Sequence, residues 1–273
     1  MAKVALCVGI NYMGTSSELP DCAKDANDVS EMLSGRGFHV ERLLDGEATA
    51  ARILEKLSAM IKATTYGDLA LFTYSGHGSW VPDQSGDEPD GKDEIICPVD
   101  VFSGNWISDD QLGEIFSERA RGARVVFMSD SCHSGTVHKF AAIPTHILPA
   151  PETPTPPQSP RRVRFLPPGT FMKALAARTA HDAPPQRPTQ PSRATSAALL
   201  MSGCQDWEFS YSTGTNGAFT RAWIDALDAE QILSYQDWYR GVRTKLPTSE
   251  YPQVPAIRGA AYQRRWAVLA EGR

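Results

Sequence analysis

The chain of 273 residues is long enough for one large or two small domains, and its 41% of hydrophobic residues can form a sizeable core. Residues 1–135 hold 22 Asp and Glu against 11 Lys and Arg, a surface that would attract cations and repel nucleic acid, so we expect no nucleic-acid binding. The five widely spaced cysteines form no Cys-x-x-Cys pair, and neither an apolar run of 18 residues nor a convincing signal peptide is present, which favours a cytoplasmic protein without disulfides, structural zinc or a membrane segment.

The first part of the chain alternates between strand-like and helix-like segments. Residues 3–10 form an apolar run typical of a strand, and residues 20–33 carry apolar positions at helical spacing. A short strand over residues 38–43 and a helix over residues 49–61 follow, and residues 68–74 are again apolar. This βαβ order predicts an α/β fold with a parallel sheet, whose strands end at one common edge.

Two reactive side chains follow strand-like runs at that edge. His77 comes directly after residues 68–74, and Cys132 follows the apolar run of residues 123–128. A cysteine thiolate is a nucleophile and histidine is its usual base, so the two predict a catalytic dyad. Glycines beside both residues leave room for the backbone, and we expect the amides of Gly78 and Cys132 to form an oxyanion hole. A cysteine near a strand end is otherwise most often a small buried hydrophobic residue.

Other polar residues leave alternatives open. Residues 79–95 are strongly acidic and predict a long exposed loop, with a short strand from residue 95 to 99. Asp109 and Asp110 begin a predicted helix, where carboxylates suit the helix dipole as well as a metal ion. His133 could compete as the base, although a neighbour in sequence usually points elsewhere.

A zinc site formed by Cys132, His133 and His138 lacks both the usual ligand spacing and a fourth ligand. We therefore expect no zinc at this position.

A proline-rich segment divides the chain. Residues 137–196 contain 13 of the 20 prolines and few aromatic residues, so we expect a flexible linker that is disordered or extended. Strand-like sequence resumes at residues 196–204, and two helices follow over residues 217–229 and 235–246. The last segments, near residues 254–257 and 266–269, could add a final strand.

The motif from Tyr74 to Gly78, together with the motif from Asp130 to Gly135, resembles the metacaspases and their bacterial relatives, the orthocaspases. The resemblance covers about three quarters of the chain, and the Gln-Ala-Cys signature of caspases proper is absent. It implies a caspase-like three-layer sandwich with a central, mostly parallel sheet flanked by helices. Residues 1–136 would form the large-subunit region, residues 137–196 the linker, and residues 197–273 the small-subunit region that completes the same domain.

The same resemblance implies cleavage after arginine or lysine. The family's pocket for the basic side chain corresponds here to Cys22, Asp25, Ser75 and Asp130. A guanidinium donates bidentate hydrogen bonds to carboxylates, which suits this set of residues. Cys22 could instead be a core residue and Asp25 part of a solvated helix face.

Calcium dependence is a further implication of the resemblance. Asp93, Asp109 and Asp110 occupy positions that fit the family's calcium ligands. The chain departs from the family pattern, however, since residues 133–151 contain no acidic residue. A second departure lies at Cys204-Gln205-Asp206-Trp207-Glu208, where an aromatic residue replaces a small acidic or polar one.

The motifs and the resemblance together predict a cysteine endopeptidase, and the resemblance implies a monomer that acts on protein or peptide substrates with Arg or Lys before the cleaved bond. His77 would take the thiol proton of Cys132, and the thiolate would form an acyl-enzyme. We also expect self-processing in the linker, at basic residues taken to be exposed: Arg161, Arg162, Arg164, Arg178, Arg187 and Arg193. The alternative is a caspase-fold regulatory or interaction module with little or no proteolysis.

Overall fold

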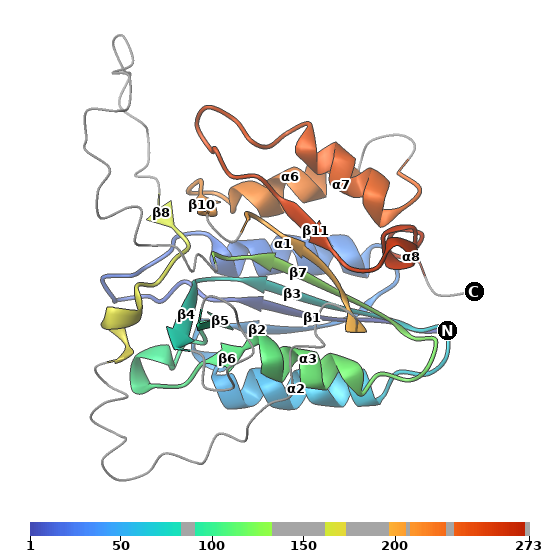
Figure 1. The fold of residues 1–273 in the computed structure, drawn as a ribbon, viewed down its shortest axis with the longest axis horizontal. Coiled ribbons are helices and arrows are strands. Elements are labelled where there is room, and N and C mark those ends of the chain that lie inside the picture. Colours follow the sequence, from blue (N-terminus) through green and yellow to red (C-terminus); the bar gives the residue numbers. More distant parts are fainter. Residues whose placement is uncertain (83–90, 133–161, 173–196, 206–207, 228–231, 271–273) are drawn as a thin grey trace.

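The computed structural model describes residues 1–82, 91–132, 162–172, 197–205, 208–227 and 232–270. Within these ranges the centre of the molecule is a six-stranded sheet with the strand order β11-β9-β7-β3-β1-β2 (Figure 1). Its strands have the following bounds: β1 Lys3–Gly9, β2 His39–Leu44, β3 Leu69–Ser75, β7 Arg124–Asp130, β9 Leu199–Ser202 and β11 Ala256–Arg258. All neighbouring pairs are parallel except β11, which runs antiparallel to β9. The predicted α/β class and the mostly parallel sheet are confirmed.

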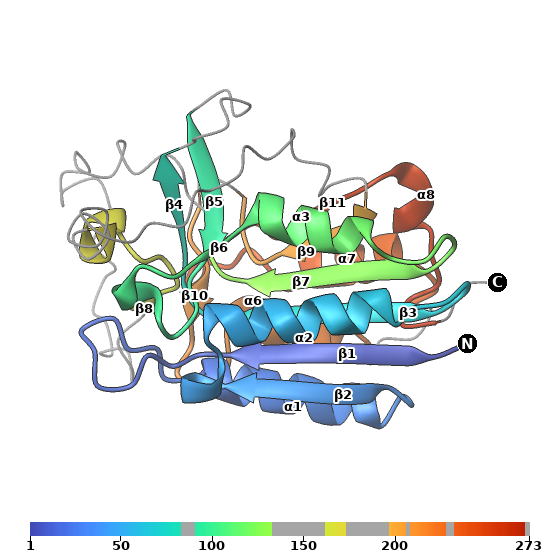
Figure 2. The same cartoon turned by 90° about the horizontal axis from the view of Figure 1, so that it is seen from below.

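Helices cover both faces of this sheet and give the molecule three layers (Figures 1 and 2). The helices α1 (Cys22–Ser34), α6 (Ala218–Leu227) and α7 (Tyr235–Arg243) lie on one face. The helices α2 (Ala50–Lys62) and α3 (Asp109–Ser117) lie on the other. Because both faces are covered, the central strands are mostly apolar, and every residue of β3 is buried.

Smaller elements surround the sheet. Three short strands form an antiparallel sheet of their own: β4 Gly78–Pro82, β5 Lys92–Ile96 and β6 Ile107–Ser108. Two further strands, β8 Arg162–Val163 and β10 Tyr211–Ser212, pair antiparallel. Single turns of 3-10 helix are η1 Asp45–Glu47, η2 Val101–Ser103 and η4 Pro168–Thr170, and the short helix α8 spans Ala261–Arg264.

Three expectations need correction. The acidic stretch is not a loop throughout, since its two ends form β4 and β5, which pair with each other. Residues 266–269 do not form a strand, because the last strand of the sheet is β11. The proline-rich region includes a segment with defined structure, residues 162–172, in which Leu166 and Phe171 are fully buried.

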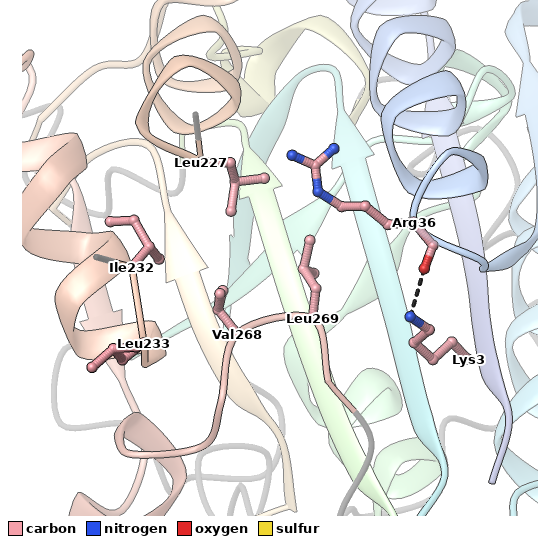
Figure 3. Close-up of a pocket in the computed structure, with 7 residues that line it drawn as sticks. All are labelled: Lys3, Arg36, Leu227, Ile232, Leu233, Val268 and Leu269. Atoms are coloured by element: carbon pink, nitrogen blue, oxygen red, sulfur yellow. Dashed lines mark hydrogen bonds between the residues drawn. The ribbon is translucent and has the colours of Figure 1, made fainter. Parts of the chain in front are cut away.

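The edge of the sheet at which the strands begin carries a surface pocket of about 470 Å³ (Figure 3). Lys3 at the start of β1 donates a hydrogen bond to the Arg36 carbonyl oxygen at 2.5 Å there. The pocket is lined by Lys3, Arg36, Leu227, Ile232, Leu233, Val268 and Leu269. The predicted site lies at the opposite edge, where β3 and β7 end. Among the described residues, no helix is long and apolar enough to cross a membrane.

The centre of the core gives a stability prediction. Phe72 of β3 is fully buried and its ring stacks on Phe127 of β7, with 4.9 Å between the ring centroids. Replacing Phe72 with Ala removes this packing, and we expect the free energy of unfolding to fall by about 3–5 kcal/mol in urea titrations. Leu233→Ala, at a side chain that is 74% exposed, is the control and should change the value by less than about 0.5 kcal/mol. Equal effects of the two substitutions would contradict the packing described here.

Candidate active site

The parallel pairing of β3 with β7 brings the two reactive residues together. Ser75 at the end of β3 lies opposite Asp130 at the end of β7. His77 and Cys132 each follow two residues later, and both are almost completely buried. The adjacent strand ends therefore hold imidazole and thiol at the same edge of the sheet, where open α/β sheets bind their ligands.

The imidazole of His77 has a fixed orientation. Its Nε2 lies 2.6 Å from the carbonyl oxygen of Ser17, and the ring packs against Tyr12 with 4.7 Å between the ring centroids. A carbonyl only accepts hydrogen bonds, so Nε2 carries the proton and Nδ1 presents a lone pair. In the described part of the chain Nδ1 has no hydrogen-bond partner. Burial lowers the pKa of His77 to about 4, opposed by the Ser17 carbonyl, so the ring is a neutral base at pH 7.

The backbone around His77 is held by a cluster of tyrosine hydroxyls. Tyr12 accepts a hydrogen bond from the His77 amide at 3.0 Å, and Tyr74 donates to the His77 carbonyl at 2.7 Å. The carbonyl of Cys97 accepts from both tyrosines. These buried bonds determine where the imidazole emerges from the end of β3.

The thiol of Cys132 contacts the segment that follows β9. Its Sγ accepts a hydrogen bond from the Ser210 amide at 2.7 Å, and the thiol of Cys204 donates to the Ser131 carbonyl at 3.6 Å. No hydrogen bond joins Cys132 to His77 among the described residues. The Cys132 thiol therefore contacts the Ser210 backbone and not the imidazole in this structure.

An arginine of the proline-rich region fills the predicted basic-residue pocket. The Arg164 side chain, which the sequence led us to expect on the surface, is completely buried. Its Nη2 lies 2.7 Å from Asp25, and its Nη1 donates to Ser75 at 2.6 Å and lies 3.3 Å from an Asp130 carboxylate oxygen. Cys22 is fully buried beside Ser75, and burial raises the pKa of its thiol. The structure thus gathers all four predicted pocket residues around one guanidinium.

The sequence interpretation missed Asp21. Its carboxylate accepts a hydrogen bond from Arg164 Nη2 at 2.8 Å and is itself completely shielded from solvent. The hydroxyl of Ser212 and the amides of Thr213 and Gly214 also donate to it. Asp21 stands four residues before Asp25 at the start of α1, and this spacing was a signal that two carboxylates share one side of the helix.

The other two carboxylates are held by the small-subunit region. Asn216 and the Gly217 amide donate to Asp25, and the Thr220 amide and hydroxyl donate to Asp130. Burial and the neighbouring carboxylates raise the pKa of Asp25 to about 6, although Arg164 lowers it. The three carboxylates exceed the single guanidinium in charge, which is why these additional donors are needed.

The backbone of Arg164 contacts both amides that were predicted to form the oxyanion hole. Its carbonyl oxygen accepts hydrogen bonds from the Gly78 amide at 3.0 Å and the Cys132 amide at 3.2 Å, the two predicted oxyanion donors. Its own amide donates to the Ser210 carbonyl at 3.0 Å, beside the pairing of β8 with β10. A Cβ atom on Gly78 would collide with the Cys132 carbonyl, so this close approach requires glycine.

The predicted calcium ligands belong to two different elements. Asp93 belongs to β5, while Asp109 and Asp110 lie in the first turn of α3, behind a capping box formed by Ser108 and Gln111. Among the described residues, no group of three or more His, Cys, Asp or Glu side chains could hold a metal ion. The position of the two aspartates suits the helix dipole, and calcium binding stays a prediction of the family resemblance.

Some predicted features lie outside the described residues: His133, His138, Asp206 and Trp207, and the linker residues Arg161, Arg178, Arg187 and Arg193. Arg162 is described, and its exposed side chain donates to the Glu18 carbonyl.

The buried ion cluster predicts a pH-dependent stability effect, to be measured in a Cys132→Ala background so that the chain stays intact. Arg164→Ala leaves the pocket carboxylates uncompensated, and losses of this kind reach about 3–5 kcal/mol. A carboxyl whose pKa is raised on folding adds stability as the pH falls, because the folded state binds the proton first. Asp25 has a pKa of about 6 even with Arg164 present, so we expect the melting temperature deficit to be large at pH 8 and smaller at pH 5.

Arg162→Ala removes an exposed arginine two residues away and is the matched control, with little expected change at either pH. If Arg164→Ala lowered the melting temperature equally at pH 8 and pH 5, the proposed charge imbalance would be contradicted.

Comparisons with known proteins agree with this geometry. The caspase domain family matches residues 2–265 of the chain. Metacaspase-1 of Cryptococcus neoformans is 40% identical over 145 residues, which cover 49% of this chain and 32% of the relative. Metacaspase-7 of Arabidopsis thaliana is also 40% identical over 145 residues, covering 50% of this chain and 35% of the relative. The chain thus spans about a third of the length of these curated relatives.

Solved structures show the same fold. A protein from Geobacter sulfurreducens has a TM-score of 0.78 and 31% identity, and the match covers 100% of both chains. Caspase-1 from Spodoptera frugiperda has a TM-score of 0.55 and 12% identity, over 94% of this chain and 85% of the insect protein. The caspase-like sandwich predicted from the motifs is therefore confirmed, and the chain belongs to the family of metacaspases and caspase-like peptidases.

Proposed function

We propose that the chain is a cysteine endopeptidase that cleaves after arginine, and after lysine less efficiently, through His77 and Cys132. One observation carries the proposal: the Arg164 side chain fills a buried acidic pocket while its carbonyl oxygen accepts hydrogen bonds from the Gly78 and Cys132 amides. A peptide bond is then located at the nucleophile with its oxygen already in an oxyanion hole. The protein and peptide substrates would present a basic residue in the same way.

The mechanism follows from these positions. His77 Nδ1 takes the proton of the Cys132 thiol, and the thiolate attacks the carbonyl carbon of the basic residue. The Gly78 and Cys132 amides stabilise the negative charge that develops on the carbonyl oxygen. Breakdown of this intermediate cleaves the C–N bond, and His77 returns the proton to the leaving amine. Water, deprotonated by His77, then hydrolyses the thioester and releases a carboxylate product.

The pocket chemistry favours arginine over lysine. The two terminal nitrogens of Arg164 reach different partners: Nη2 contacts Asp21 and Asp25, and Nη1 contacts Ser75. A planar guanidinium matches this divided arrangement, whereas an ammonium is a single point of charge on a shorter reach. Lysine would leave Asp21 or Ser75 without its donor, which is costly in a buried site.

Self-processing at Arg164 is part of the same proposal. The bond between Arg164 and Phe165 is the one presented to Cys132, since the Arg164 carbonyl accepts from the Cys132 amide. The chain would therefore be cut there first, rather than at another linker arginine. This replaces the broader expectation of cleavage at any exposed basic residue.

A second candidate function is a regulatory or interaction module with little proteolysis. Its support is that the pocket is filled by the chain's own arginine and that no hydrogen bond joins His77 and Cys132 among the described residues. In that case Arg164 is a permanent structural ion pair, and no basic peptide would be turned over.

Short fluorogenic peptides that end in Arg, Lys or Asp before the dye test specificity. We expect cleavage of the Arg peptide, a kcat/KM about tenfold lower for Lys, and none for Asp, because a buried charge-assisted hydrogen bond is worth a factor of about 10–100. Asp21→Asn should lower kcat/KM for Arg at least about tenfold and change the Lys value much less. Asp225→Asn, the same change at a surface ion pair on α6, is the control.

Turnover of none of the peptides would favour the module, and preference for Asp would overturn the pocket assignment. The assays are repeated with a chelator and with added calcium, since calcium dependence stays a prediction of the family resemblance.

Self-processing is tested by mass spectrometry of the purified chain. We expect a fragment that begins at Phe165, and none from the Cys132→Ala chain. Arg164→Gln should abolish this fragment, because a neutral amide cannot pair with the pocket carboxylates. Arg162→Gln is the matched control and should be processed at the normal rate. A linker cut that persists unchanged in Arg164→Gln would contradict the assigned bond.

A further inference from the structure

The chain segment that follows Arg164 is bound to the protein as firmly as the arginine itself. Phe165 lies in a parallel bridge with Gly78, and the Leu166 amide donates to the Gly78 carbonyl at 3.0 Å. The Ser79 hydroxyl, which is completely buried, donates to the Leu166 carbonyl at 2.6 Å. The first residues of β4 thus hydrogen-bond to the chain on both sides of the Arg164–Phe165 bond, as a sheet edge does with an added strand.

The side chains of the two residues after Arg164 differ in environment. Leu166 is fully buried and belongs to the same core cluster as Val81 of β4 and Ile95 of β5. Phe165 is only partly buried, with its ring 5.9 Å from that of Phe209. Since successive side chains of an extended segment point in opposite directions, the protein surrounds the second residue and leaves the first one near the surface.

We propose that the space around Leu166 is a specificity subsite for substrates, which accepts a large aliphatic side chain two positions after the cleaved bond. The inference rests on the proposed peptidase function and adds to it a sequence requirement on the leaving side. The preferred substrates are protein segments with arginine, any residue, and then leucine or a similar aliphatic residue. The subsite is open to such segments once the chain's own linker has been cut and its leaving side, with Leu166, has dissociated.

The energetic reason is burial. A leucine that is fully removed from water gains a favourable transfer free energy, whereas an aspartate at the same place would be a buried charge without a partner. The hydrogen bonds from Gly78 and Ser79 contact only the backbone of the bound segment, so they form with any sequence. Discrimination between substrates must therefore come from the side chain at the position of Leu166. This differs from the basic pocket, whose selectivity comes from charge.

Internally quenched peptides test the subsite directly. Two peptides share Val-Arg-Phe and then carry Leu or Asp, and both are given to the self-processed chain. We expect kcat/KM to be at least about tenfold higher for the Leu peptide, with an intermediate value for a third peptide with Ala. Equal rates for Leu and Asp would overturn the subsite. Failure of all three long peptides would overturn it as well, because the subsite would then not be accessible.

The outcome separates this inference from the proposed function. A dye peptide ending in Arg occupies only the arginine side of the cleaved bond, so its turnover reports the peptidase alone. If the dye peptide is cleaved and the long peptides are cleaved at equal rates, the peptidase function is supported and the subsite is contradicted. If no peptide is cleaved, the peptidase function itself is contradicted.

The chain's own linker supplies an independent measurement. Leu166→Asp should slow the cut at Arg164 at least about tenfold, and Leu166→Met, which conserves volume, should stay within about twofold of the parent. Leu233→Asp makes the same change at an exposed leucine and is the matched control. Melting temperatures in the Cys132→Ala background show whether Leu166→Asp is folded. If it is not, the peptide series decides.

Discussion

The contact on which the described structure depends is the ion cluster around Arg164. Desolvating one guanidinium and three carboxylates is expensive, and each group must be nearly saturated with hydrogen bonds for the cluster to exist. The donors come from distant parts of the chain: Ser75 from the end of β3, Ser212 from β10, and Asn216 from the segment before α6. The cluster thus joins the large-subunit region, the linker and the small-subunit region at one point, next to Cys132. On the proposed function, the same carboxylates that hold these regions together would also bind the basic side chain of a substrate.

Burial is the main reason why the imidazole of His77 is uncharged. It lowers the pKa of His77, the Ser17 carbonyl raises it, and the charge of Arg164 lowers it to a smaller extent. A neutral imidazole with its proton on Nε2 is what thiol deprotonation by Nδ1 requires.

The main strands and the positions of His77 and Cys132 at their ends could be predicted from the sequence, because they depend on local patterns. Apolar runs over residues 68–74 and 123–128 predicted the strands, and parallel topology then predicted that His77 and Cys132 lie at the same edge of the sheet. The role of Arg164 was not predictable from composition, since six linker arginines are chemically alike and the surrounding prolines indicate disorder. What distinguishes it is the pairing of the two-residue strands β8 and β10, far apart in the chain and too short to leave a periodic signal. The Nε2 contact of His77 with Ser17 is likewise a loop contact without a sequence signature.

On the proposed mechanism, the cut after Arg164 changes the balance between linker and substrates. Before the cut, the linker is held on both sides of the bond, by the acidic pocket and by the burial of Leu166 and Phe171. Cleavage separates these two anchors, and it creates a carboxylate on Arg164 where the neutral carbonyl had been, close to a pocket that already has an excess of negative charge. Repulsion between like charges in a buried site weakens the arginine side first. The leaving side keeps its apolar contacts and carries a new amino group at Phe165. The arginine side should thus become available to other chains before the leaving side does, so small substrates gain access earlier than extended ones.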